Sequence, residues 1–169
     1  MTISASNVSP VLHRVADVDE AIRAEELDSP ILLETIAALA NRGMWRQLWS
    51  VADGLSREIS VLFDSELRTW VDIGTAGKVK LKPPMGAKIP FRLWVHTHPR
   101  DAYWSSTDLS TLAAYSRILK EALVLGHDHF KRTRKASESE ESLEPQGPLS
   151  GWTSESILTY DEWEAAHDG

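Results

Sequence analysis

Apolar residues recur every three or four positions over the first third of the chain, which is the spacing of one face of a helix. This pattern predicts three helices, over residues 17–27, 31–43 and 44–55. Ser29 followed by Pro30 is typical of a helix start, because serine caps the first turn and proline needs no amide hydrogen there. Gly43 is typical of a helix stop, since glycine readily takes the left-handed conformation that ends a helix.

Short apolar runs replace this pattern from Glu58 onward, and some of them alternate with polar residues as strands do. Strands are predicted over residues 58–63, 68–73, 78–82 and 91–95. A helix is then predicted from Ser105 or Ser106 to about Leu123. Residues 122–126 fit either the end of that helix or another strand.

The remaining elements and their order indicate the fold class. An exposed strand is predicted over residues 129–135, and the tail is expected to add one short strand and a helical turn or two. Strands and helices do not alternate regularly, so the order favours an α/β sandwich with a mixed, largely antiparallel sheet flanked by helices. We interpret the chain as one domain. Its segments are an N-terminal helical extension, a core, a flexible acidic loop or linker, and a C-terminal tail, over residues 1–43, 44–135, 136–151 and 152–169.

The composition narrows the class of protein. The 169-residue chain has a net charge of −7, which disfavours a general nucleic-acid binder because such proteins are usually basic. It has no cysteine, which excludes disulfides, thiolate metal ligands and a cysteine nucleophile, and which fits a reducing cytoplasm. The sequence shows neither a signal peptide nor an apolar run that could span a membrane. We therefore expect a cytoplasmic protein without nucleic-acid or membrane partners; its oligomeric state is left open.

Two histidines close the predicted strand over residues 91–95. His96 and His98 are two positions apart, so on a strand their side chains point to the same face, and Thr97 points to the other. Pro99 lacks an amide hydrogen and tends to end the strand there. Both imidazoles are therefore expected at the carboxyl end of the strand.

The sequence Ser105-x-x-Asp108 follows after a short loop. Taken alone, this spacing favours a helix cap, in which the serine accepts from a backbone amide and the acidic residue suits the helix N-terminus. The short loop also allows the first helical turn to fold back over the two histidines, where Asp108 would join them. The two interpretations are compatible, because the serine can cap the helix while the aspartate binds a metal.

Two imidazoles and one carboxylate suit zinc, and three protein ligands leave a fourth position for water, as in catalytic sites. Such a site also needs a carboxylate that acts as a general base. Glu58 is the best candidate, because it stands at the start of the apolar strand ISVLF and would be held by the sheet. Its competitors are carboxylates in the neighbouring turn and in a helix: Glu66, Glu34 and Asp64.

At these residues the sequence resembles the JAMM (MPN-type) zinc metalloprotease family, whose pattern is an upstream glutamate, H-x-H-P and then S-x-x-D. Here HTHP occupies residues 96–99 and SSTD occupies residues 105–108, and EISVLF over residues 58–63 is similar to the family's glutamate-led strand. The loop between the two motifs is one residue shorter than in the family. The resemblance covers residues 56–125 and implies a JAMM (MPN, cytidine-deaminase-like) α/β sandwich, with residues 44–135 as its catalytic core.

The resemblance also implies an activity. His96, His98 and Asp108 would be the ligands of one zinc ion per chain, Glu58 would activate water, and Ser105 would help to stabilise the tetrahedral intermediate. The implied reaction is hydrolysis of an isopeptide or peptide bond at the C-terminus of a ubiquitin-like modifier, so that modifier or its conjugates are the expected partner. Two alternatives stay open: a non-catalytic MPN-type scaffold, and a hydrolase of this fold that acts on a sulfur-carrier conjugate or a small molecule.

Three further features lie outside the candidate zinc ligands. His127-Asp128-His129 repeats the H-x-H spacing without the proline, serine and aspartate, so it is expected to be solvent-exposed rather than metal-bound. The basic run over residues 131–135 is expected to form a solvated face, with contact to an acidic partner as the alternative. Tyr103 and Trp104 fit either contact with the substrate tail or packing of the loop.

Overall fold

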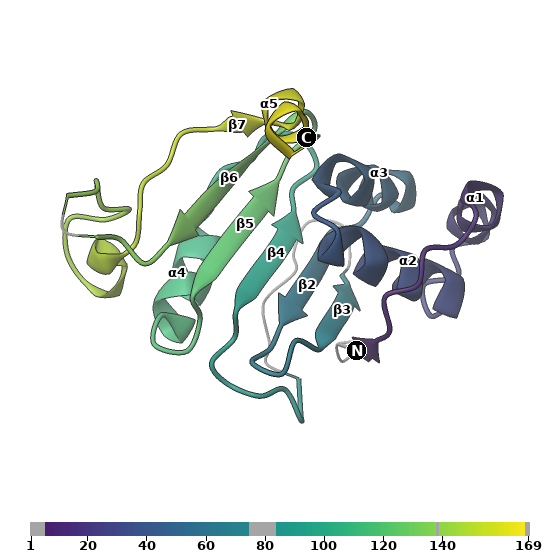
Figure 1. Cartoon of the computed structure of the whole chain (residues 1–169), viewed down its shortest axis with the longest axis horizontal. Coiled ribbons are helices and arrows are strands. Elements are labelled where there is room, and N and C mark those ends of the chain that lie inside the picture. Colours follow the sequence, from purple (N-terminus) through teal and green to yellow (C-terminus); the bar gives the residue numbers. More distant parts are fainter. Residues whose placement is uncertain (1–5, 75–83, 138, 168–169) are drawn as a thin grey trace.

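The computed structural model describes residues 6–74, 84–137 and 139–167. In this part of the chain a seven-stranded sheet is covered by helices on both faces (Figure 1). The strands are β1 (Ser6–Val8), β2 (Ile59–Phe63), β3 (Thr69–Ile73), β4 (Leu93–Thr97), β5 (Glu121–Leu125), β6 (His129–Arg134) and β7 (Leu158–Thr159). The helices are α1 (Val15–Arg23), α2 (Pro30–Asn41), α3 (Trp45–Leu55), α4 (Ser106–Tyr115) and α5 (Tyr160–His167), with a 3-10 turn at Pro148–Gly151.

The sheet is mixed and largely antiparallel, as the sequence predicted. Its strand order is β1-β3-β2-β4-β5-β6-β7, and β4 with β5 form its parallel pair. Parallel neighbours need a crossover connection, and α4 supplies it between β4 and β5. The β4–α4–β5 unit therefore brings the start of a helix back over the end of a central strand.

Each face of the sheet has its own hydrophobic core. The alternation of side chains along the strands sends Val61 and Val95 to the core under α1, α2, α3 and α5. Leu62 and Trp94 go to the other core, which α4 covers together with the 3-10 turn and Trp152. In Figure 1, α4 accordingly lies on the opposite side of the sheet from α3.

The three N-terminal helices confirm the sequence pattern. Pro30 takes the first position of α2 after Ser29, and Gly43 has the positive φ of 66° that follows the helix end. These helices share a core with the sheet, because Leu32, Ile36 and Leu48 pack in the same cluster as the strand residues of that face.

The helix predicted from Ser105 or Ser106 to about Leu123 is too long. The structure ends α4 at Tyr115, and residues 121–125 form β5. Pairing with β4 and β6 satisfies the backbone of β5 on both sides, and residues 122–125 are all buried. A central strand buried on both faces has a continuous apolar run, which helical spacing does not distinguish from a helix end.

The remaining predictions concern the strands over residues 129–135 and 78–82 and the C-terminal tail. The strand over residues 129–135 exists as β6, and β7 pairs with its first two residues. Phe130 and Thr133 are buried, contrary to expectation, while the other four residues are partly exposed. The predicted strand over residues 78–82 lies outside the described residues. The tail confirms its prediction, with one short strand, β7, followed by α5.

Candidate metal centre

Strand β4 positions both histidines of the candidate centre. His96 lies within β4, and the amide of His98, one residue past its end, donates to the carbonyl of Leu125 at 2.8 Å, which extends the pairing with β5. Thr97 faces the other side, where its hydroxyl accepts from the amide of Ile59 at 2.9 Å. The two imidazoles therefore share the face of the sheet that α4 covers.

The first turn of α4 supplies the carboxylate. Ser105 is the N-cap, its Oγ accepts from the Asp108 amide at 3.1 Å, and Asp108 Oδ2 accepts from the Ser105 amide at 3.1 Å. This is a complete capping box, which holds the Asp108 side chain in one orientation. The capping and the metal-ligand interpretations of S-x-x-D thus describe the same aspartate.

Asp108 lies between the two imidazoles. Its Oδ1 is 3.1 Å from His96 Nε2 and its Oδ2 is 3.0 Å from His98 Nε2. The three residues are 1%, 7% and 4% exposed for His96, His98 and Asp108. Burial by itself raises the pKa of Asp108, but the adjacent His96 and His98 and the Ser105 amide outweigh it and hold that pKa well below its usual range. The carboxylate is therefore ionised, as a metal ligand must be.

The surroundings of His96 fit a cation. One potential ligand atom from each of His96, His98 and Asp108 lies within 4.8 Å of the others. Although His96 Nε2 is at ion-pair distance from Asp108, neither of its ring nitrogens makes a hydrogen bond within the described part of the chain. The ring is held instead by stacking on Trp94, with centroids 4.2 Å apart. A buried imidazole without hydrogen bonds is costly, and coordination of a metal would satisfy it.

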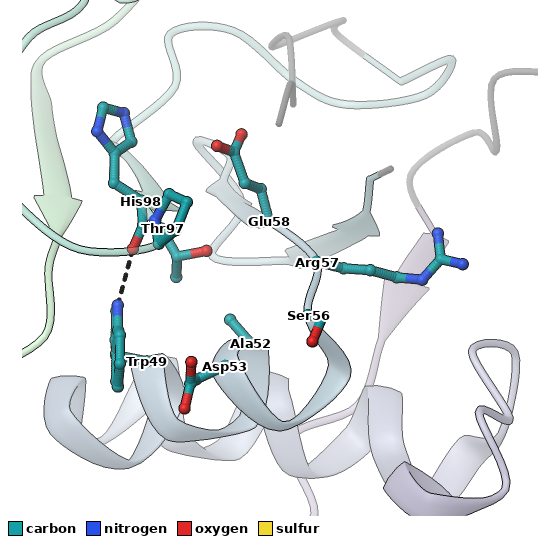
Figure 2. A pocket seen from close by; sticks show the side chains of 9 residues that line it. Trp49, Ala52, Asp53, Ser56, Arg57, Glu58, Thr97 and His98 are labelled. Atoms are coloured by element: carbon teal, nitrogen blue, oxygen red, sulfur yellow. Dashed lines mark hydrogen bonds between the residues drawn. The ribbon is translucent and has the colours of Figure 1, made fainter. Parts of the chain in front are cut away.

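Strand pairing places Glu58 at this end of the sheet. β2 and β4 are antiparallel with Ser60 opposite His96, so Glu58, one residue before β2, comes opposite His98. Alternation along β2 also puts the Glu58 side chain on the same face as Ser60 and the two histidines. Figure 2 shows the Glu58 carboxylate and the His98 imidazole both directed away from helix α3.

A pocket of about 230 Å³ lies where α3 faces the ends of β2 and β4, and Glu58 and His98 are part of its lining (Figure 2). Trp49 of α3 forms another wall, and its indole N–H donates to the carbonyl of His98 at 2.8 Å. This bond ties α3 to the strand end that carries the histidines.

The competing carboxylates lie elsewhere. Glu66 is in the exposed turn after β2, and a strand of five residues puts that turn roughly 15 Å or more from Glu58. Glu34 is on α2 and is paired with His13 at 3.0 Å. Asp64 is fully buried and accepts from Trp70 Nε1 and from the backbone amides of that turn. Among the four candidates only Glu58 is at the histidine end of β2.

Tyr103 and Trp104, in the loop between His98 and Ser105, differ in their exposure to solvent. Trp104 is half-buried and packs against the core that α4 covers. Tyr103 is 55% exposed, and its ring meets that of His98 edge-on at 4.8 Å. Trp104 therefore packs the loop against the core. Tyr103 presents an aromatic ring to solvent beside the centre.

The second H-x-H motif has a role that the sequence analysis missed. His129 is not solvent-exposed: its Nε2 accepts from the Ala102 amide at 3.0 Å, and its Nδ1 is 2.6 Å from Asp128 Oδ1. Because Nε2 accepts, the proton is on Nδ1 and is donated to Asp128. The neighbouring His127 amide donates to the Arg100 carbonyl at 2.7 Å. The turn after β5 thus braces the loop between His98 and Ser105.

Gly126 is the one local signal for this brace. A Cβ on Gly126 would lie 2.7 Å from the Ala102 nitrogen and 2.8 Å from the Arg100 oxygen, so the loop passes too close for any other residue. A glycine between an apolar strand and a polar turn often marks such a close backbone approach.

The brace predicts different effects for two substitutions at one position. His129→Gln keeps an acceptor near the position of Nε2, whereas the shorter His129→Asn cannot reach Ala102. We expect His129→Asn to lower the free energy of unfolding by about 1 kcal/mol relative to His129→Gln, because one buried amide loses its partner. Hydrogen exchange at the Ala102 amide should be faster in His129→Asn alone. Equal exchange rates in both variants would contradict the brace.

No helix of the described residues is long and apolar enough to cross a bilayer. Comparisons with protein-family models, with curated protein sequences and with solved structures found no match.

Proposed function

We propose that this protein is a zinc-dependent metalloprotease of JAMM type that hydrolyses isopeptide or peptide bonds at the C-terminus of ubiquitin-like modifiers. The observation that carries the proposal is the buried group of His96, His98 and Asp108 with the unsatisfied ring nitrogens of His96. The resemblance of HTHP and SSTD to the JAMM motif, with Glu58 at the same end of the sheet, supports the reaction class.

Zinc suits these ligands better than a harder cation, because two of the three are imidazoles. His96 and His98 would bind through Nε2, and Asp108 through its carboxylate. When bound, zinc supplies Lewis acidity, which acidifies water and polarises a carbonyl. The capping box would keep Asp108 in place as a ligand.

Glu58 would transfer the proton, and Ser105 would stabilise the oxyanion. The Glu58 carboxylate accepts a proton from the attacking water and passes it to the nitrogen of the leaving amine, which makes one group both base and acid. Ser105 accepts the Asp108 amide hydrogen at its Oγ and can donate its own hydroxyl hydrogen to the oxyanion of the substrate. Removing a donor of that kind costs about 10²–10³ in kcat.

An exposed aromatic side chain beside the centre suits the tail of a modifier. The pocket of about 230 Å³ lies on the α3 side of the strand ends, so the substrate would approach from the opposite face, onto which the Glu58 and His98 side chains point (Figure 2). The exposed Tyr103 ring next to His98 gives the C-terminal tail of a modifier an aromatic contact. The absence of cysteine suits a reducing compartment, so we place the activity in the cytoplasm.

The proposal is tested by incubating the zinc-loaded protein with a panel of ubiquitin-like conjugates, with and without chelator. We expect cleavage that the chelator abolishes and added zinc restores. Chelator-sensitive hydrolysis of sulfur-carrier conjugates or small amides alone would change the substrate class. Absence of hydrolysis across the whole panel, in protein that holds zinc, would favour a scaffold.

A further inference from the structure

The strand ends opposite the candidate metal centre carry a concentration of positive charge. β4 and β5 begin there and β6 ends there, at the lower edge of the sheet in Figure 1. A shallow pocket of about 690 Å³ opens at this edge, and we call it the cationic basin. It is lined by Pro90, Arg92, residues 117–121, Arg134 and Lys135.

The charge of the basin opposes that of the whole chain. Five of its lining residues are cations and one, Glu121, is a carboxylate, although the chain has a net charge of −7. Burial raises the pKa of Glu121, which the neighbouring Arg132 partly offsets. Counting Glu121 as a full negative charge, the basin still carries a net positive charge.

Four of the five cations form no ion pair with a described residue, and Glu121 is the one carboxylate among the lining residues. Arg134 is paired with Glu140, with nitrogen–oxygen distances of 2.6 and 3.1 Å. Arg92, Arg117, Lys120 and Lys135 form no ion pair with any described residue. Gathering unpaired like charges opposes folding, and an anion that occupies the basin would remove this cost.

Two of the cations are held in place by neutral contacts. The Lys135 ammonium donates to the Ser116 carbonyl and lies 4.6 Å from the centre of the Trp152 ring. The Arg92 guanidinium lies 5.2 Å from the centre of the Phe63 ring. Cations that are positioned by rings and carbonyls keep their charge available to a ligand and lose less entropy when they bind it.

We propose that the cationic basin binds a small organic molecule that carries two or more phosphate groups. Guanidinium and ammonium groups that converge from separate segments match an anion with several oxygens, because arginine bonds phosphate in a two-pronged fashion and lysine adds a point charge. Pro90 and Ile118 give the same basin apolar surface for the organic part. Its volume is within the range of small-molecule sites. The proposal does not depend on the hydrolase activity.

The test is a titration of the full chain with inorganic pyrophosphate at low ionic strength, followed by amide chemical shifts. We expect saturable shifts at residues 117–121 and at Arg134 and Lys135, which weaken as salt is added. Arg117→Ser/Lys120→Ser should weaken binding about tenfold or more, since each exposed cation contributes charge-assisted bonds. The matched control, Arg23→Ser/Arg42→Ser, removes the same charge from exposed positions outside the basin and should bind as the wild type does.

Four results would overturn the proposal: no saturable binding, shifts confined to His96, His98 and Asp108, equal losses in the two double variants, or tighter binding of a polyglutamate peptide than of pyrophosphate by the basin. The second would assign the anion to the metal centre. The third would indicate a general charge effect, and the fourth would indicate an acidic protein segment as the occupant. Thermal melting of both double variants checks that each is folded.

Discussion

His96→Ala and Asp108→Ala should each yield protein that retains almost no zinc, whereas the wild type should hold about one zinc ion per chain after dialysis. Each substitution removes one of three buried ligands. Losing an outer partner of a ligand already costs roughly 10- to 100-fold in metal affinity, and losing a ligand itself should cost more. Elemental analysis of protein purified without chelator measures the metal content directly.

Controls separate loss of metal from loss of fold. Asp108→Ala also breaks the capping box, so Asp108→Asn is the sharper variant: its amide oxygen can still accept from the Ser105 amide, but it is a weaker zinc ligand. His167→Ala and Asp19→Ala change the same residue types at exposed positions on α5 and α1 and should keep the full zinc content. A wild-type protein without zinc, or a variant series in which zinc content does not change, would remove the basis of the metal centre.

Glu58→Gln should keep the zinc and lose hydrolysis. Glutamine preserves the size of the side chain but cannot accept a proton, and a general base contributes about 10²–10⁴ in rate. The expected result is therefore a fall of that size in kcat/KM at unchanged metal content. The measurement is a chelator-controlled rate on whichever conjugate the panel identifies.

The matched control for this experiment is Glu66→Gln. Glu66 lies in the turn at the other end of β2, so its loss should leave the rate unchanged. Full activity in Glu58→Gln together with loss in Glu66→Gln would reverse the assignment. Loss of zinc in Glu58→Gln would make Glu58 part of the metal site rather than the base.

The parts of the fold that the sequence predicted correctly have strong local patterns. Ser29, Pro30 and Gly43 mark the ends of helices whose apolar faces repeat at helical spacing. The prediction was wrong at the end of α4, because β5 has a continuous apolar run and its identity as a strand depends on pairing with β4 and β6. It was also wrong about Phe130 and Thr133 of β6, which are buried because β7 pairs beside Phe130 and Thr133 bonds to Thr153.

The partners of His129 and of the basin cations likewise depend on contacts between distant segments of the chain. His129 was expected to be solvent-exposed because its H-x-H motif lacks the proline, serine and aspartate that follow the first one. One of its partners, the Ala102 amide, is 27 positions away and reaches it only because β4 and β5 are adjacent. The cations of the basin come from the segment before β4, the segment before β5 and the end of β6, and no single stretch of sequence contains them.

The sequence by itself determined that His96, His98 and Asp108 could converge, because the geometry involved is local: alternation along one strand, a short loop, and the first turn of a capped helix. The sequence favoured Glu58 over its competitors, but only the tertiary structure placed it at the histidine end of the sheet, through the antiparallel register of β2 with β4. The tertiary structure also decided which residues brace the loop and where the unpaired cations gather. These are contacts between distant segments, and strand order and register, which set them, are not encoded in any local pattern.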